Sequence, residues 1–371
     1  MSCPAPPVRL AALALLFAVL LAAAPAGAQT APPAGVTATA VVHRVFDDPA
    51  LADSASLGHV ALPLTVYGSV APGVDVSLRA AYVSSSVGDS RAAGFADAQV
   101  GLSVRRPVGG GEVAVGVAAT VPAGGGLTQP EAAAAFVAAQ EFYAFGATAL
   151  RGGPSVTPSL SVAVPAGPGV VVGGGVAYRV RPGFEPRAGL DDAFDPGDEF
   201  SLTAGLDALL PDGSTLAVDA LYSRFGADAY VRPETADSLE YATGDAFGAA
   251  AAWAGIVGGA PVTVVASVQR RTDADVDPVA QARLGLSAAV PTRARLAATL
   301  GARFGPRLTA AVSAGARFYA ASGAFGSRSL ADVAVAPAYR VGDRVTVVGR
   351  LGGTVGSFTV VEAGLGLSVG F

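Results

Sequence analysis

The 371-residue chain contains no lysine and no asparagine, so all 24 of its basic residues are arginine. Without lysine it cannot carry the lysine of a nucleotide-binding P-loop or a lysine that forms a Schiff base with a substrate. Its only cysteine, Cys3, lies ahead of an apolar leader. The rest of the chain therefore has neither a thiolate ligand for a metal nor a cysteine nucleophile.

Charge is scarce as well. Charged residues make up 14% of the chain, the net charge is −5 at pH 7, and no basic run occurs. Proteins that bind nucleic acid concentrate positive charge on one surface, so we exclude nucleic acid as a partner. The residues in excess are small or apolar: the chain has 48 glycines and is 51% hydrophobic. Its length suits two average soluble domains or one large barrel.

Residues 1–28 have the three parts of a secretory signal peptide. Arg9 supplies the positive charge, residues 10–23 are apolar, and residues 26–28 (AGA) match a cleavage site. The apolar part is short for a membrane-spanning helix, although a retained N-terminal anchor is the alternative. We expect cleavage after residue 28, a Pro/Ala-rich linker over residues 29–35, and one domain over residues 36–371.

The longest uncharged segment beyond the leader, residues 246–269, is long enough to span a membrane as a helix. It has GGAP (258–261) at its centre, which ends a helix and favours a turn. The runs on either side are rich in valine and alanine. We therefore interpret this segment as a β-hairpin.

Most of the chain has hydrophobic residues at every second position. In the last fourteen residues, FTVVEAGLGLSVGF, the residues at alternate positions are Val361, Ala363, Leu365, Leu367, Val369 and Phe371. This period of two is typical of a strand with one apolar face. The opposite face, here and in similar segments upstream, is small or polar and has too little charge for a surface in water. A strand with an apolar face toward lipid, and a face of small and polar residues toward a lumen, is typical of a transmembrane barrel.

We therefore predict an all-β fold: a transmembrane antiparallel up-and-down β-barrel of about 14–16 strands (range 12–18). Short turns alternate with longer connections over residues 122–154, 182–198 and 227–243. Residues 131–140 predict a short helix over or inside the mouth. Residues 36–46 are either the first strand or an extension or plug.

On this alternation, a set of charged residues faces the lumen. These predicted lumen-lining residues are Arg79, Arg105, Arg179, Arg283, Arg317, Arg344, Arg350, Asp97, Asp219 and Glu362, with Arg295 and Arg303 following the same pattern. A basic lumen wall would favour anions. The alternative is that Arg–carboxylate pairs fill the interior of a narrow barrel. Glu362 is predicted to lie opposite Arg344 or Arg350 on the neighbouring strand.

Signals for catalysis or metal binding are weak. His43 and His59 flank a loop, and Ser54 or Ser56 nearby has no nucleophile motif around it, so we interpret the histidines as rim residues and expect no catalytic residue. The alternate carboxylates Asp273, Asp275 and Asp277 offer oxygen ligands for a divalent cation, yet they lack the glycine and distal glutamate of an EF-hand. We expect no metal, no cofactor and no enzyme activity.

Two short motifs carry a family resemblance. Residues 94–102 (GFADAQVGL) resemble the G-x-G/A-D-x-x-[LV]-G-L strand of the outer-membrane proteins of the meta-pathway of phenol degradation, and residues 121–124 (VPAG) resemble their L-P-T-G. Residues 64–78 also resemble that family's opening strand, turn and strand. The family resembles fatty-acid and aromatic-hydrocarbon channels, which implies uptake of small hydrophobic compounds. The Asn-Pro-Ala plug motif of the fatty-acid channels is missing.

Together these features predict a channel of the bacterial outer membrane that passively admits small hydrophobic or aromatic solutes. The C-terminal strand resembles the one that the barrel-assembly machinery reads, with Leu367, Val369 and Phe371 as its signal. The expected partners are that machinery, outer-membrane lipid and lipopolysaccharide, and the solute. One alternative is a structural or surface-interaction barrel with a filled lumen. Another is a barrel enzyme acting on lipids, which would use His43 or His59.

Overall fold

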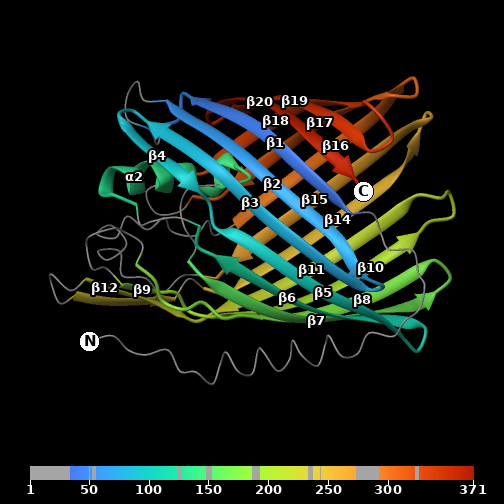
Figure 1. The fold of residues 1–371 in the computed structure, drawn as a ribbon, viewed down its shortest axis with the longest axis horizontal. Helices are drawn as coiled ribbons and strands as arrows, with labels where there is room; N and C mark the ends of the chain where they lie inside the picture. The colour runs from blue at the N-terminus through green and yellow to red at the C-terminus, as the bar shows by residue number, and fades with distance from the viewer. Residues whose placement is uncertain are drawn as a thin grey trace.

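The computed structural model is a closed antiparallel β-barrel of sixteen strands in a single domain (Figure 1). It describes residues 34–49, 51, 56–123, 127–147, 153–185, 193–232, 237–242, 244–272, 292–321 and 326–371. The expected signal peptide therefore lies outside the described residues, as do Ser54, Arg283 and the three carboxylates at 273, 275 and 277. The sheet closes between the first and last strands, which pair from Gly35↔Gly370 to Phe46↔Thr359.

Each wall strand pairs with two neighbours, so the barrel has no free edge over most of its height. The wall strands are β1 (Gly35–Phe46), β2 (Leu57–Ala71), β3 (Val74–Val87), β5 (Ala98–Val108), β6 (Gly111–Val121), β7 (Ser155–Gly167), β8 (Val170–Arg179), β10 (Glu199–Leu209), β11 (Thr215–Phe225), β14 (Ala246–Val257), β15 (Ala260–Arg271), β16 (Thr292–Phe304), β17 (Leu308–Tyr319), β18 (Arg328–Arg340), β19 (Val345–Gly356) and β20 (Thr359–Gly370).

A seventeenth strand in the sheet, β4 (Ser90–Phe95), pairs only with the upper part of β3 and precedes β5 after a break at Ala96 and Asp97. A separate three-stranded sheet is formed by β9 (Ala193–Asp195), β12 (Ala227–Arg232) and β13 (Asp237–Ala242). Helix is confined to α2 (Gln129–Ala138) and the short η1 (Glu141–Tyr143). No helix among the described residues is long and apolar enough to cross a membrane.

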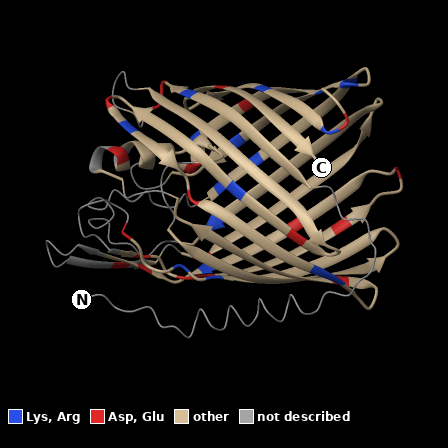
Figure 2. Ribbon diagram, viewed as in Figure 1, with Lys and Arg blue, Asp and Glu red and all other residues tan. Residues whose placement is uncertain are grey.

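The predicted alternation places apolar side chains on the outside of the barrel. Leu365 on β20 is 64% exposed and Leu296 on β16 is 55% exposed, and each is flanked along its strand by residues that face the lumen. Charged residues are sparse along the strands (Figure 2). In water this outer face would be a very large apolar patch, so its natural surroundings are hydrocarbon.

The connections fall into two groups at opposite ends of the barrel. Seven short turns follow β2, β5, β7, β10, β14, β16 and β18 at one end, where Ala34 and Phe371 also lie, since the Phe371 N–H donates to the Ala34 carbonyl at 2.8 Å. The longer connections, α2 and the small sheet lie at the other end (Figure 1). By the usual pattern of such barrels, the short-turn end is periplasmic and the long-loop end is extracellular.

Several predictions are confirmed. Residues 246–269 form the hairpin of β14 and β15, the short helix is α2, and sixteen wall strands fall within the predicted range. Residues 36–46 are a wall strand and not a plug. Some positions differ: β3–β4 and β19–β20 are joined by short turns at the long-loop end, and Phe358 is buried inside the mouth.

Candidate functional site

The candidate site is the barrel lumen, and its shape is set by an inward-folded segment, residues 127–147. This segment begins with α2, whose first turn is closed by Glu131: its carboxylate accepts hydrogen bonds from the Thr128 N–H at 2.8 Å and the Thr128 hydroxyl at 2.6 Å. These two bonds hold the pKa of Glu131 below its usual value. Ser, Thr and Asp-type caps of this kind satisfy donors that a helix start leaves unpaired.

Helix α2 lies against the inner wall of the barrel. Its buried residues Ala134 and Ala135, with Leu127 before it, pack against Ala61, Val83 and Ala92 of β2, β3 and β4. Small side chains on both surfaces let the helix backbone approach the sheet closely. The alanine-rich sequence of the helix therefore serves contact with the wall.

After α2 the segment is fixed by an aromatic cluster that includes a buried ion pair. The Tyr143 hydroxyl donates to Asp48 at 2.7 Å, and Asp48 pairs with Arg328 at 2.8 Å. The Arg328 guanidinium lies 4.2 Å from the centre of the Phe142 ring, and Phe358 contacts the same ring. Burial and the bond to Asp48 raise the pKa of Tyr143, so the hydroxyl stays protonated as a donor.

The two histidines lie inside this cluster, and their interpretation as rim residues was wrong. His43 and His59 are cross-strand neighbours, with ring centres 5.7 Å apart, and Phe145 stacks on His59 at 4.2 Å. They face inward because they share a face with the buried Val45 and Leu57. The loop that follows β1 therefore does not carry them into solvent.

This cluster contains a serine within reach of a histidine, which makes catalysis worth testing against the geometry. His59 Nδ1 lies 3.0 Å from the Ser85 hydroxyl oxygen, but both residues have no exposed surface. Glu362 approaches the other histidine, His43, at 3.8 Å. Ser56 bonds Arg44 on the outer face, away from both rings. A substrate carbonyl has no route to Ser85, so the arrangement does not suit a nucleophile.

Eight of the ten predicted lumen-lining residues lie on the inner side of the wall. These are Arg79, Arg105, Arg179, Arg317, Arg350, Asp97, Asp219 and Glu362, as the cross-strand registers and the cavity linings place them. Arg344 lies in the turn between β18 and β19, and Arg283 is outside the described residues. The predicted partner of Glu362 is Arg350, whose Nε donates to its carboxylate.

Most of the inward arginines are paired with a carboxylate. The pairs are Arg105–Asp75 at 2.5 Å, Arg179–Glu199 at 3.1 Å, Arg181–Asp228 at 3.7 Å, Arg293–Glu141 at 3.1 Å and Arg317–Asp332 at 2.7 Å, together with Arg350–Glu362. Arg79 and Arg295 have no carboxylate within 4 Å among the residues that the structure describes. Arg303 also lacks a carboxylate partner but donates to the Gly305 carbonyl near the short-turn end, so Arg79 and Arg295 are the unpaired guanidinium groups that line the upper cavities.

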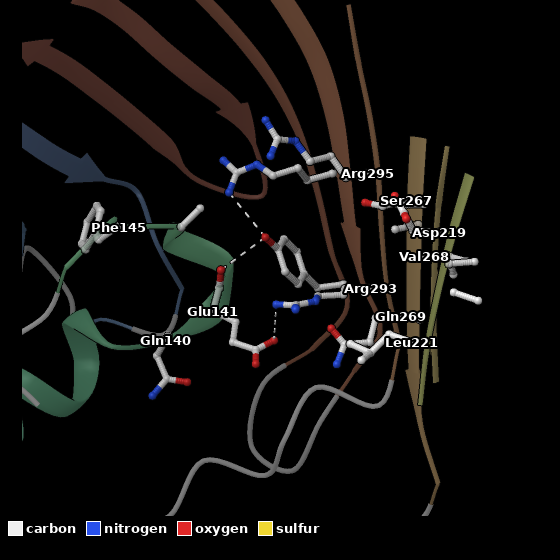
Figure 3. A pocket seen from close by; sticks show the side chains of 18 of the residues that line it. Gln140, Glu141, Phe145, Asp219, Leu221, Ser267, Val268, Gln269, Arg293 and Arg295 are labelled. Carbon is white, nitrogen blue, oxygen red and sulfur yellow. Dashed lines mark hydrogen bonds and ion pairs between the residues drawn. The ribbon is translucent and has the colours of Figure 1, made fainter. Parts of the chain in front are cut away.

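Each of these two arginines lines a separate cavity. The larger cavity, about 780 Å³, lies between residues 138–145 and the wall of β10, β11 and β14–β17, and Arg295 lines it with Arg293, Gln269, Ser267 and Asp219 (Figure 3). The smaller, about 600 Å³, is bounded by Gly146, Ala147 and the wall of β2–β8, where Arg79 lies with Arg179 and Asp97. The inward-folded segment therefore divides the upper lumen into two compartments.

Comparisons with known proteins do not assign this lumen. No protein-family model matches the chain, and no curated protein matches its sequence. Among solved structures, OprB of Pseudomonas putida at low pH is 12% identical over 91% of this chain and 92% of its own, with a TM-score of 0.44. An anion-selective porin from Comamonas acidovorans is 12% identical over 92% and 99%, with a TM-score of 0.43. OpdQ of Pseudomonas aeruginosa is 13% identical over 91% and 97%, with a TM-score of 0.44.

At these sequence identities and TM-scores, the similarities support no conclusion about function. The resemblance to the meta-pathway family also stays a prediction, as does the role of Leu367, Val369 and Phe371 as an assembly signal. Leu367 faces outward on β20, and Phe371 is exposed beyond the end of that strand.

Sequence reasoning missed the residues that fix the inward segment. Glu141 reaches Arg293, 152 positions later in the chain, and Asp48 reaches Tyr143 over 95 positions. No pattern of residue spacing in the sequence predicts contacts over such distances along the chain. One signal was present: residues 141–145 (EFYAF) are rich in aromatics for a loop, which indicates burial.

Proposed function

We propose that the protein is a channel of the bacterial outer membrane that passively admits small solutes through the compartments beside the inward-folded segment. The closed barrel with an apolar outer face supports the membrane location. The observation that carries the channel role is the 780 Å³ cavity, which lies inside the barrel and is lined by apolar side chains together with a group of charged and polar ones, among them Asp219, Gln269 and Arg295. A barrel built only for structure has no need of such a cavity.

We further propose that the preferred solutes are small organic acids. Arg295 lines one compartment and Arg79 the other, and neither has a carboxylate partner among the described residues. A guanidinium binds a carboxylate through two parallel hydrogen bonds. The expected aromatic solutes fit this chemistry as aromatic carboxylates, because the larger compartment also offers Leu221 and Phe145 to a ring. A neutral hydrocarbon would leave both guanidinium groups unused.

The test is electrical. Purified protein in a planar lipid bilayer, with a KCl gradient, should conduct and should show a reversal potential that favours chloride. Arg79→Ala with Arg295→Ala should reduce the chloride-to-potassium permeability ratio severalfold. Arg224→Ala with Arg270→Ala is the matched control, since it removes two arginines of β11 and β15 that face outward, on the opposite strand face from Asp219 and Gln269. An unchanged ratio in the double variant would refute the preference for anions.

The second candidate is a structural or surface-interaction barrel with a filled lumen. It is favoured by seven inward ion pairs among the described residues, Arg328–Asp48 included, and by the packing of residues 127–147 inside the mouth. The same bilayer experiment separates the two functions. No conductance, and no uptake of benzoate or a sugar into protein-containing liposomes, would leave the filled barrel as the function.

A further inference from the structure

The outer face of the barrel carries a row of polar residues across four neighbouring strands. Arg44 on β1 is opposite Gly58 on β2, Gly58 is opposite Ser86 on β3, and Ser86 is opposite Arg91 on β4. The side chains of Arg44, Ser86 and Arg91 face outward, because the alternate residues His43, His59 and Ser85 face the interior. With strands about 4.8 Å apart, the Cα atoms of the two arginines are roughly 14 Å from each other.

Between the two arginines the surface is hollowed. A depression of about 280 Å³ is lined by Arg44, Val60, Ser84, Ser86 and Arg91. The floor of this hollow is Gly58, where a Cβ atom would lie 2.9 Å from the Ser86 hydroxyl and 3.3 Å from Nη1 of Arg44. The glycine thus lets the Arg44 guanidinium and the Ser86 hydroxyl lie close over the strand, and any larger residue would push them aside.

Hydroxyl groups hold the two guanidinium groups at the edge of this hollow. Nη2 of Arg44 donates to the Ser56 hydroxyl at 2.7 Å, and Nε of Arg91 donates to the Ser84 hydroxyl at 3.3 Å. Neither arginine has a carboxylate within 4 Å among the described residues. No carboxylate of the described residues therefore pairs with either charge, and both guanidinium groups line the hollow.

The height of the row fits the boundary between hydrocarbon and headgroups. Toward the middle of the strands, Leu62 is opposite Tyr82, and Tyr82 is opposite Phe95, with the two rings edge to face at 5.6 Å. Aromatic side chains of this kind mark the membrane interface of transmembrane barrels. The arginine row lies on the long-loop side of that pair, where the phosphate groups of the outer leaflet would lie.

We propose that this row, defined as Arg44, Gly58, Ser86 and Arg91, binds a phosphate monoester of a glycolipid in the outer leaflet. Two guanidinium groups and free hydroxyl donors match the oxygens and the charge of a phosphate monoester. A phosphodiester has one charge and fewer free oxygens, so an ordinary phospholipid satisfies the row less well. The proposal rests on the membrane location and not on conduction through the lumen.

Binding is measured on the whole protein in detergent micelles by native mass spectrometry, with diphosphoryl lipid A as the probe. The wild-type protein should retain bound lipid A, and Arg44→Ala with Arg91→Ala should weaken the binding at least tenfold. The control is Arg224→Ala with Arg270→Ala, which removes two outward arginines at the same end, on β11 and β15, that do not line this hollow. An equal loss in the control variant would mean general electrostatic attraction and would overturn the proposal.

A second variant keeps the charge and fills the hollow. Gly58→Val places a strand-compatible side chain against Ser86 and Arg44, and we expect it to weaken lipid A binding severalfold while both arginines remain. Wild-type binding to this variant would overturn the proposal. Folding of each variant is checked by the shift in gel mobility between boiled and unboiled samples.

Competing probes identify the source of the phosphate. Monophosphoryl lipid A and phosphatidylglycerol should bind more weakly than diphosphoryl lipid A, and inorganic phosphate should not displace it. If phosphatidylglycerol binds equally well, or inorganic phosphate displaces the lipid at equal concentration, the assignment to a glycolipid is wrong. Conductance of the double variant should match the wild type, so a failure of lipid binding and a failure of transport remain distinct results.

Discussion

Two halves of the barrel wall have the same outer face but different inner faces. In β1–β4 and β18–β20, the inner positions near the long loops are apolar and buried, as at Val45, Leu57 and Val360, and they pack against the inward-folded segment. In β10, β11 and β14–β16, the corresponding wall presents Asp219, Gln269, Arg293 and Arg295 to the larger cavity. The period-two pattern of each strand therefore decides which residues face inward, whereas the inward-folded segment decides which of these are buried.

The largest expected effect tests the packed half. Arg328→Ala would remove the guanidinium that pairs with the Asp48 carboxylate beneath the aromatic cluster, where both residues are buried. Breaking a buried pair in this way costs about 3–5 kcal/mol. The loss is measured from urea unfolding in detergent, followed by the fluorescence of Trp253, the only tryptophan.

The matched control lies in the open half. Arg295→Ala removes a guanidinium with no carboxylate within 4 Å among the described residues, so its cost should stay within about 0.5 kcal/mol. Equal destabilisation by the two substitutions would mean that the halves do not differ as described.

The next effect concerns the outer face, where the two halves should behave alike. Leu365→Arg on β20 and Leu296→Arg on β16 each place a charge near mid-strand, and each should cost about 2–4 kcal/mol in a bilayer. Leu308→Arg, at the first residue of β17 beside a short turn, should cost only about 0–1 kcal/mol. Refolding into liposomes under urea gives these free energies.

If Leu308→Arg proved as costly as Leu365→Arg, depth along the strand would not be the controlling variable. Val345, at the first residue of β19, has the same position beside a short turn and should tolerate arginine equally well.

A smaller effect is expected at the turn that ends η1. Ala144 has φ of 57°, in the left-handed region that glycine adopts without steric cost. Ala144→Gly should therefore stabilise the protein by about 1 kcal/mol. Differential scanning calorimetry measures this, with Ala147→Gly as the control that should give no gain. A lower melting temperature for Ala144→Gly would show that the side chain contributes more by packing than its conformation costs.

The smallest effect is a dependence of α2 on pH. The two bonds from Thr128 lower the pKa of Glu131 in the folded protein. Stability from a depressed pKa is fully present above the unfolded value, about 4.3, and is lost as the pH falls through the lower folded value. We therefore expect amide-exchange protection in α2 to fall below about pH 4.

The control for this prediction is the variant Glu131→Gln. Its side chain does not titrate, so protection of α2 should be the same on either side of that pH. A drop in protection of equal size in Glu131→Gln would assign the effect to other carboxylates.

The barrel and its strand directions could be predicted because the period of two is a local property of the sequence. The same pattern placed eight of the ten lumen residues on the inner side. It could not place the histidines, since His43 and His59 are buried by Phe145, which arrives from a connection about a hundred residues later. A further hint was present in residues 41–46 (VVHRVF), where both strand faces are apolar near the mouth. That pattern indicates a second packing surface inside the wall.

The contact between Ala34 and Phe371 bears on where the termini of a circularly permuted chain could be placed. Because β1 and β20 pair along their whole length, and the start of β1 meets the end of β20 at the short-turn end, the seam between them is one hairpin without its turn. A short linker from residue 371 to residue 34 would complete that hairpin, and the ring could then be opened at any other short turn, such as the one after β5. The barrel should therefore tolerate circular permutation, with the wall fixed by cyclic strand order and indifferent to which strand comes first.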